Sequence, residues 1–395
     1  MEPVQVRSKE MNRIGIFVFY DKDGVVDDCV CYLLDSLKNI LRDLIIVSNG
    51  SLSDEGIEKF HRYTKRIFFR EDKGFDLGAC KDVFCKFLEN EKWEQWDEVV
   101  ILNDTFYGPF FDWKIVFEYM EKKNIDFWAL DEENKKIEKD KELTRWIIPY
   151  FYVVRKSIIK NNVFKSFWEK IDCEVVEYGK GYGTSLFQEY ELTRFLKQRN
   201  FRYTTWLVEN DGCKYLDIAT KGDHNTMFSY ELLKYCKFPI IRKKALSIFF
   251  YPVSVKALDY IDKHTDYDIG LILESQTRLY KNNAAFSYSE DTLKKFVETH
   301  EDIYVFGHGL LSNGLTEYFK DNNWKIKAYV VSKRVKDNEI ALDNLNLKRN
   351  DGVIVALGIV NMNEMRSKLQ EKIPEDQLLM YQHRSMKSEM RGSVE

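Results

Sequence analysis

The sequence predicts an α/β protein in which two modules follow one another along the chain. Over the first 130 residues, short apolar runs typical of buried strands alternate with segments whose apolar residues recur at helical spacing. This is the pattern of repeated β-α-β units. The alternation returns after residue 290, where it predicts a second, smaller Rossmann-like module. A chain of 395 residues is also longer than a typical single hydrophobic core.

Composition and charge exclude several classes of protein. Charged residues make up 31% of the chain but leave a net charge of only -4, which argues against a generally basic nucleic-acid-binding protein. No apolar run approaches 18 residues, and the charged N-terminus lacks the apolar region of a signal peptide. The seven cysteines form no CxxC pair, which favours a reduced, cytoplasmic protein.

In the first module we expect parallel strands whose carboxyl ends share one edge, where open α/β sheets bind ligands. Ser53 is the expected N-cap of the second helix. The predicted strands are residues 13–20, 43–50, 66–71 and 97–104, and the predicted helices are residues 27–43, 52–65 and part of 73–91. Further strands are expected at 126–131, 147–156 and 201–208, with helices at 161–171 and 185–200.

The C-terminal module is expected to contain a β-α-β unit over residues 292–333. A strand at 352–358, a helix at 362–373 and a strand at 377–382 complete it. The periodic pattern is poorest between the two modules. We therefore predict domains at residues 1–245 and 290–395, joined by an irregular connection at 246–289.

Polar residues follow two of the predicted strands. Asn103 and Asp104 end the strand in VVILNDTFYGPF (99–110), where they indicate either a tight turn or a site for a metal and a phosphate. REDKGFDLGACKD (70–82) places Asp76 between Gly74 and Gly78 at the start of a helix. This arrangement is typical of a β-α turn, and glycines at a helix N-terminus also suit an anionic ligand.

Four blocks in order make a more specific pattern. They are FVFYDKDG (17–24), IIVSNG (45–50), REDKGFDLGACKD (70–82) and LNDTFYGPFF (102–111). Together they resemble the rhamnan synthesis F (RgpF-like) glycosyltransferase family, as do YELTRFLKQRNFRY (190–203) and KFPIIRKKAL (237–246). The resemblance covers residues 13–246 and leaves 290–395 outside it. It implies a GT-A-like, nucleotide-sugar-binding fold for residues 1–245.

The resemblance also implies a donor site, with Asp76 at the base or ribose and Lys73 or Arg70 facing the phosphates. The donor-binding residues that it implies are Tyr20, Asp21, Asn49, Arg70, Lys73, Asp76, Asn103 and Asp104. The DxD element of GT-A enzymes corresponds here to Asn103-Asp104-Thr105, which departs from two carboxylates. A divalent cation, Mn²⁺ or Mg²⁺, would be held by Asp104 and by His224 from a late loop. The implied donor is a nucleotide sugar such as dTDP-rhamnose.

Inverting sugar transfer needs a general base, usually a carboxylate. The helix at 185–200 offers Glu189 and Glu191, which point in different directions, and the YExxLT match selects Glu191. The alternative is a solvated helix glutamate or a salt bridge between Glu191 and Arg194 or Arg155. For Trp146, Tyr150, Tyr152 and Trp206, core packing is favoured over an acceptor groove, and Asp131 is a further candidate on the acceptor side.

The expected partners are a nucleotide sugar and a glycan or lipid-linked glycan acceptor, without nucleic acid. The basic and aromatic segment at 240–252 suits either peripheral binding at the inner face of the cell membrane or a buried strand beside a basic turn. Two alternatives stay open. One is a non-catalytic scaffold of a glycan assembly complex. The other is a nucleotide-dependent enzyme acting through the tail, whose loose GxGx₄G at Gly307, Gly309 and Gly314 lacks the usual ribose-binding acid.

Overall fold

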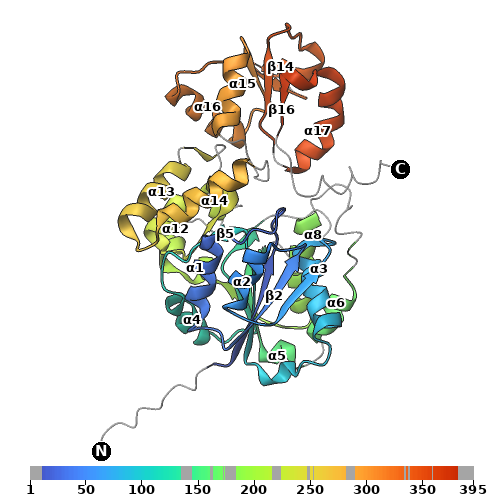
Figure 1. Cartoon of the computed structure of the whole chain (residues 1–395), viewed down its shortest axis with the longest axis vertical. Coiled ribbons are helices and arrows are strands. Elements are labelled where there is room, and N and C mark those ends of the chain that lie inside the picture. The colour runs from blue at the N-terminus through green and yellow to red at the C-terminus, as the bar shows by residue number, and fades with distance from the viewer. Residues whose placement is uncertain are drawn as a thin grey trace, which may run out of the picture. The chain divides into compact units, whose positions relative to one another are not determined.

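The computed structural model describes residues 11–134, 145–160, 163–171, 173, 184–215, 224–246, 250–251, 253–281, 290–332, 335–336, 339–357 and 359–380 (Figure 1). Contacts within the chain divide it into two compact units. The first comprises residues 1–104, 111–178 and 184–222, and the second comprises 105–110, 179–183 and 223–395. The chain therefore leaves the first unit directly after Asp104.

The first unit is built on one mixed sheet, which in the described residues has seven strands in the order β10-β6-β9-β4-β1-β2-β3. The strands are β1 (Arg13–Phe19), β2 (Asp43–Asn49), β3 (Ile67–Arg70), β4 (Glu98–Asn103), β6 (Phe127–Ala129), β9 (Phe151–Arg155) and β10 (Tyr203–Thr205). Strand β9 is antiparallel to β4 and β6, and the other pairs are parallel. The predicted α/β class with a mainly parallel sheet is confirmed.

Helices cover both faces of this sheet, which is why β1 and β4 are buried along their whole length. The helices of this unit are α1 (Asp28–Leu37), α2 (Asp54–His61), α3 (Phe75–Asp82), α4 (Trp113–Glu121), α5 (Lys156–Ile159), α6 (Val163–Glu169), α8 (Thr184–Lys197), α9 (Trp206–Glu209) and α10 (Asp211–Tyr215). The unit also contains a separate pair of short strands, β7 (Glu132–Asn134) and β8 (Arg145–Ile147). Ile16 packs with residues of α3, α6 and α8, whereas Phe17 lies edge-on against Phe60 of α2. The Ser53 hydroxyl accepts the Gly56 N–H at 3.0 Å, as predicted for the N-cap.

One predicted strand is much shorter than expected. Residues 201–208 form only β10, and the chain continues as α9 from Trp206. Thr205 explains the change, because its hydroxyl accepts the backbone N–H of Val208 as an N-cap. The β-branched and aromatic residues that predicted a longer strand therefore divide between a strand and a helical turn.

The second unit begins with the turn that follows Asp104. Its elements before residue 290 are β5 (Phe106–Tyr107), α11 (His224–Met227), α12 (Ser229–Cys236), β11 (Ile241–Arg242), α13 (Val253–His264) and α14 (Ile269–Lys281). Strand β5 pairs antiparallel with β11. The predicted irregular connection at 246–289 is wrong for its central part, which forms α13 and α14. The division between compact units lies near residue 222 rather than 245.

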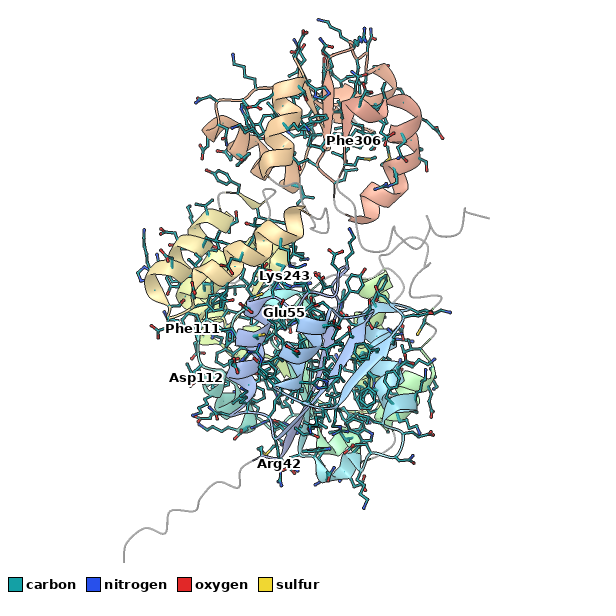
Figure 2. The ribbon with its side chains drawn as sticks, viewed as in Figure 1. Arg42, Glu55, Phe111, Asp112, Lys243 and Phe306 are labelled. Carbon is teal, nitrogen blue, oxygen red and sulfur yellow. The ribbon has the colours of Figure 1, made fainter. Side chains whose placement is uncertain are left out.

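The C-terminal part of the second unit contains a parallel sheet, with five strands described in the order β14-β13-β12-β15-β16. Its elements are α15 (Glu290–Thr299), β12 (Ile303–Phe306), α16 (Leu310–Asp321), β13 (Ile326–Val331), β14 (Glu339–Ala341), β15 (Gly352–Val355), α17 (Ile359–Lys372) and β16 (Leu378–Leu379). The chain order 3-2-1-4-5 of these strands is that of a doubly wound fold, as predicted. Phe306, the last residue of β12, is buried in its core (Figure 2).

Two further findings bear on the sequence analysis. None of the seven cysteines, all of which lie in the described part of the chain, forms a disulfide. Within the described residues, no helix combines the length and apolar character needed to cross a membrane.

Candidate active site

The carboxyl ends of β1, β2, β3 and β4 lie side by side at one edge of the first sheet. Phe19 of β1 is level with Ser48 of β2, and Asn49 of β2 is level with Arg70 of β3. On the other side, Val18 of β1 is level with Asn103 of β4. The loops after these four strands carry the blocks of the sequence pattern. The shared edge expected from the sequence is therefore present.

The loop after β1 is shaped by Asp21. One oxygen of its carboxylate accepts the backbone N–H groups of Asp23 and Val25, both at 2.9 Å. Gly24 has a φ of 70°, a left-handed conformation that glycine adopts without steric cost. Tyr20, which precedes Asp21, is half-buried. Asp21 thus fixes the turn, and a contact between Tyr20 or Asp21 and the donor stays a prediction.

Arg70 ties the ends of β2 and β3 to helix α3. Its Nη1 donates to Asn49 Oδ1 at 2.7 Å, its Nε donates to Asp82 Oδ2 at 2.6 Å, and its Nη2 donates to the carbonyl of Lys73. The Arg70 side chain is only 7% exposed. All three guanidinium nitrogens therefore bind protein groups. These bonds make Arg70 a residue that positions Asn49, and a contact of Arg70 or Lys73 with the phosphates stays a prediction.

The glycines of residues 70–82 serve the fold of this loop. A Cβ on Gly78 would lie 2.1 Å from the carbonyl oxygen of Lys73, so a larger residue at position 78 would push the loop away. Gly74 has a φ of 74° and is the N-cap of helix α3. The contacts of Gly74 and Gly78 therefore support one of the two interpretations of these glycines, the compact β-α turn.

Asn103 joins the end of β4 to Asp76. Its Nδ2 donates to Asp76 Oδ2 at 2.6 Å, and its backbone N–H donates to the carbonyl of Tyr150 at 3.1 Å. Asn103 is 5% exposed. An amide suits this position because it can donate to the Asp76 carboxylate, whereas a carboxylate here would repel it. The departure from two carboxylates in the sequence pattern thus has a local structural reason.

Two buried side chains, Cys80 and Tyr152, lie near the Asn103–Asp76 pair. Cys80 on α3 and Tyr152 on β9 are both buried and share a hydrogen bond. Burial, together with the nearby Asp76 carboxylate, raises the pKa of the Cys80 thiol to about 12. Burial also raises the pKa of Tyr152 well above its usual value. Cys80 is therefore a neutral, packed thiol rather than a nucleophile.

Asp104 is the remaining carboxylate of the sequence pattern at the end of β4. Among the described residues, no group of three or more His, Cys, Asp or Glu side chains is placed to hold a metal ion. The described residues therefore provide no complete protein cage for a metal. Mg²⁺ commonly binds through one or two carboxylates and the phosphates of a substrate, and a single Asp104 meets only the first part of that requirement.

The two candidate bases lie on helix α8. The side chain of Glu189 is outside the described residues. Glu191 forms an ion pair with Arg194, with Nε at 3.2 Å from Oε1, and its side chain is 25% exposed. Arg155, the other partner considered for Glu191, binds Glu98 at 3.0 Å. The salt-bridge alternative is thus present in the structure, and the catalytic role of Glu191 stays a prediction.

His224 belongs to the second unit, where it begins α11 and is fully buried. The neighbouring Asn225 accepts the backbone N–H of Arg242 at 2.7 Å and so holds the end of β11. His224 was expected in a loop, and its role as a metal ligand stays a prediction. The basic and aromatic segment at 240–252 contains β11 and a short turn, and residues 247–249 and 252 lie outside the described part of the chain.

The turn after Asp104 is anchored within the second unit by residues that the sequence analysis missed. The Thr105 carbonyl accepts the backbone N–H of Lys243 at 2.9 Å. The Tyr107 hydroxyl accepts from Gln276 at 2.7 Å and lies 3.2 Å from Ser275 Oγ. Lys243, labelled in Figure 2, has its ammonium 5.5 Å from the centre of the Tyr107 ring. These partners lie about 135 to 170 residues away in the chain, so no local signal reveals them.

The aromatic residues considered for an acceptor groove are part of the core. Trp146, Tyr150, Tyr152 and Trp206 are all buried. Asp131 is buried as well, and one of its oxygens accepts from the Tyr150 hydroxyl at 3.3 Å. Core packing, the favoured alternative for the aromatic residues, is confirmed.

A family model described as rhamnan synthesis protein F matches residues 44–364, which is most of the chain. The chain belongs to the rhamnan synthesis protein F family. This confirms the family inferred from the four blocks, and with it the prediction of a glycosyltransferase of polysaccharide synthesis. The match also corrects the predicted extent of the resemblance. It runs past residue 246 and includes β12 to β15 of the C-terminal sheet.

Several solved structures are similar to parts of this family member. Core-mannan synthase A of Aspergillus fumigatus, in an Mn/GDP form, is 10% identical over 49% of this chain and 72% of that one, with a TM-score of 0.31. Glucosyl-3-phosphoglycerate synthase of Mycobacterium tuberculosis, in complex with Mn²⁺, UDP and glucosyl-3-phosphoglycerate, is 12% identical over 58% and 81%, with a TM-score of 0.28. A comparison with curated proteins gave no match.

Proposed function

We propose that this rhamnan synthesis protein F transfers a hexosyl group from a nucleotide diphosphate sugar to a growing cell-surface polysaccharide. The observation that supports it most is the polar network at the carboxyl edge of the first sheet. There Asn49, Arg70, Asp76 and Asn103 come from three separate sequence blocks and form two hydrogen-bonded pairs, Arg70 with Asn49 at 2.7 Å and Asn103 with Asp76 at 2.6 Å. A polar network at this edge of an α/β sheet is expected where a nucleotide binds.

In this proposal the donor is dTDP-rhamnose, because the family description refers to rhamnan. Asp104 faces the diphosphate and holds a divalent cation, Mn²⁺ or Mg²⁺, together with the phosphate oxygens. The bound cation would neutralise the charge that develops on the leaving diphosphate. Arg70 keeps Asn49 in place, and Asp76 contacts the base or ribose.

The proposed reaction inverts the anomeric carbon. Glu191 takes the proton from an acceptor hydroxyl, whose oxygen forms a bond to the anomeric carbon while the bond from that carbon to the diphosphate breaks. The proton remains on the Glu191 carboxyl, and the nucleoside diphosphate leaves. The acceptor is a glycan or lipid-linked glycan, and the enzyme works in the cytoplasm at the inner face of the membrane.

A second function is supported by one specific observation. Asn103 occupies the place of the first carboxylate in a DxD element, and its amide is bound to Asp76. A protein that binds no metal and acts as a scaffold of a glycan assembly complex would also be expected to have an asparagine in place of this carboxylate.

The two functions are separated by measuring nucleoside diphosphate release from a panel of nucleotide sugars with Mg²⁺ or Mn²⁺ and a rhamnan oligosaccharide acceptor. An enzyme should release dTDP from dTDP-rhamnose, and Asp104→Ala and Glu191→Gln should each abolish release. Asp54→Ala, which removes an exposed carboxylate from α2, is the matched control and should keep full activity. A scaffold would show no release with any donor, and cells carrying either variant would still make the polysaccharide.

A further inference from the structure

The side chain of Asn49 carries a polar group that the fold leaves unused. Asn49 ends β2 at the carboxyl edge of the first sheet and is 0% exposed. Its Oδ1 accepts a hydrogen bond from Arg70 Nη1 at 2.7 Å. Its Nδ2 is buried and has no hydrogen-bond partner among the residues that the structure describes. Buried polar groups in native proteins are nearly always paired, so an unpaired one calls for an explanation.

The orientation of this amide is fixed by chemistry. A guanidinium group has only donors, so the oxygen of Asn49 must face Arg70 and the nitrogen must face away. Arg70 is itself held by the Asp82 carboxylate at 2.6 Å, which keeps the guanidinium in place. The usual ambiguity between the two ends of an asparagine amide therefore does not arise here. The unpaired group is an N–H donor.

The position of this donor points to a ligand oxygen. Asn49 is followed by Gly50, which has a φ of 138° and open space where a Cβ would lie. The backbone beside Asn49 therefore leaves room at the edge where the proposed donor nucleotide binds. A ligand that offers an acceptor atom to Nδ2 would complete the hydrogen bonds of Asn49 without disturbing Arg70.

We propose that Asn49 selects the base of the donor nucleotide by donating its free N–H to a base carbonyl oxygen. This inference rests on the proposed function. Uracil, thymine, cytosine and guanine all carry an exocyclic carbonyl oxygen, whereas adenine offers only ring nitrogens as acceptors and carries a donor amino group at C6. A site that offers a buried donor discriminates strongly against an analogue that lacks the matching acceptor, because the donor then stays unpaired. The site should therefore reject adenine nucleotides.

The test is calorimetric titration of the full chain with UDP, dTDP, CDP, GDP and ADP. We expect at least one carbonyl-bearing nucleotide to bind about tenfold or more tightly than ADP. Asn49→Asp keeps the side-chain shape and the contact with Arg70 but removes the N–H donor. It should reduce that preference to within about threefold while leaving ADP binding nearly unchanged. Ser48→Ala, one residue earlier and on the opposite face of β2, is the control and should keep the preference.

Three results would overturn the inference. ADP could bind as tightly as every other nucleotide, or Asn49→Asp could weaken all five equally, which would assign the acceptor oxygen to the ribose or diphosphate. The third is an unchanged preference in Asn49→Asp at an unchanged melting temperature, which would leave a buried water as the partner. Failure of the proposed function looks different, because then the wild-type chain binds no nucleotide of any kind.

Discussion

The carboxyl edges of the parallel strands differ between the first sheet and the C-terminal sheet. At the carboxyl edge of the first sheet, side chains from β2, β3 and β4 and from helix α3 form two hydrogen-bonded groups, one around Arg70 and one around Asn103. At the corresponding edge of the C-terminal sheet, a histidine that follows β12 binds residues of β13 and β14. His308 stacks on the Tyr329 ring, with 4.0 Å between ring centres, and its Nδ1 lies 2.6 Å from Glu339 Oε1.

This difference shows that the same topology does not by itself make a site. Both members of the His308–Glu339 pair bind protein groups, since Glu339 also accepts the backbone N–H of Lys336 at 2.7 Å. The first edge instead contains a carboxylate beyond a strand end, Asp104, and a buried N–H donor on Asn49 that no described residue satisfies. We therefore assign the chemistry to the first edge and a structural role to the His308 pair.

The largest expected effect separates the two edges directly. Asp104→Ala should lower the rate of sugar transfer by about 100-fold or more, because it removes the group proposed to stabilise charge at the diphosphate. His308→Ala should leave the rate unchanged. Initial rates of nucleoside diphosphate release from the two variants check this prediction. Equal losses in both variants would contradict the assignment.

The next effect concerns stability. Arg70→Met should lower the free energy of unfolding of the first unit by about 3 kcal/mol, because it leaves the Asp82 carboxylate and Asn49 without their buried partner. Lys38→Met, which breaks a surface ion pair with Asp35, is the control and should cost less than about 1 kcal/mol. Urea denaturation followed by tryptophan fluorescence suits this measurement, because every tryptophan except Trp324 lies in the first unit. A loss no larger than that of Lys38→Met would show that the network adds little.

A smaller effect is expected from restoring a second carboxylate. Asn103→Asp places a carboxylate against Asp76, where the present amide donates at 2.6 Å. The lost hydrogen bond and the repulsion should cost about 1 to 3 kcal/mol at pH 7. Repulsion also raises the pKa of one carboxyl of such a pair, so the loss should shrink as the pH falls toward 5. Urea denaturation at the two pH values measures this, and Asn103→Ala, which lacks the repulsion, should show no such recovery.

The smallest effect lies at the C-terminal edge. The Lys336 N–H and His308 lower the pKa of Glu339 below its usual value. Because the folded-state pKa is depressed, the stabilisation is complete above the unfolded-state value of about 4.3 and is lost as the pH falls through the lowered pKa. The protection factors of the β14 amides, which correct for the intrinsic pH dependence of exchange, should therefore fall more between pH 6 and pH 3 in the wild type than in Glu339→Gln. The same fall in both would exclude Glu339 as the titrating group.

The strands and their shared edge could be predicted from the sequence because buried parallel strands are continuous apolar runs. The residues at their ends were also visible, since Asn49, Asp76 and Asn103 belong to recognisable blocks. What could not be predicted is how these residues pair. Arg70 reaches Asn49 only because β2 and β3 are neighbours in the sheet, and strand order is not a local property of the sequence.

Helix α13 was not predicted for a different reason, because a helical pattern is present in its sequence. Ala257, Tyr260 and Ile261 recur at helical spacing, and all three are buried. The charged residues among and beside them, Lys256, Asp259, Asp262 and Lys263, obscured the pattern, and the segment was expected to be irregular. The turn at residues 105–110 has no such signal in the sequence, since its hydrogen bonds with Gln276 and Lys243 join residues that are distant in the chain.

The central claim is that the nucleotide binds at the edge of the first sheet. Hydrogen–deuterium exchange of the full chain with and without dTDP-rhamnose and Mg²⁺ tests it most directly. We expect slower exchange in peptides covering residues 49–50, 70–82 and 103–104, and no change in peptides covering 303–312. Protection of residues 303–312 without protection of the other three segments would contradict the claim and transfer the nucleotide site to the C-terminal sheet.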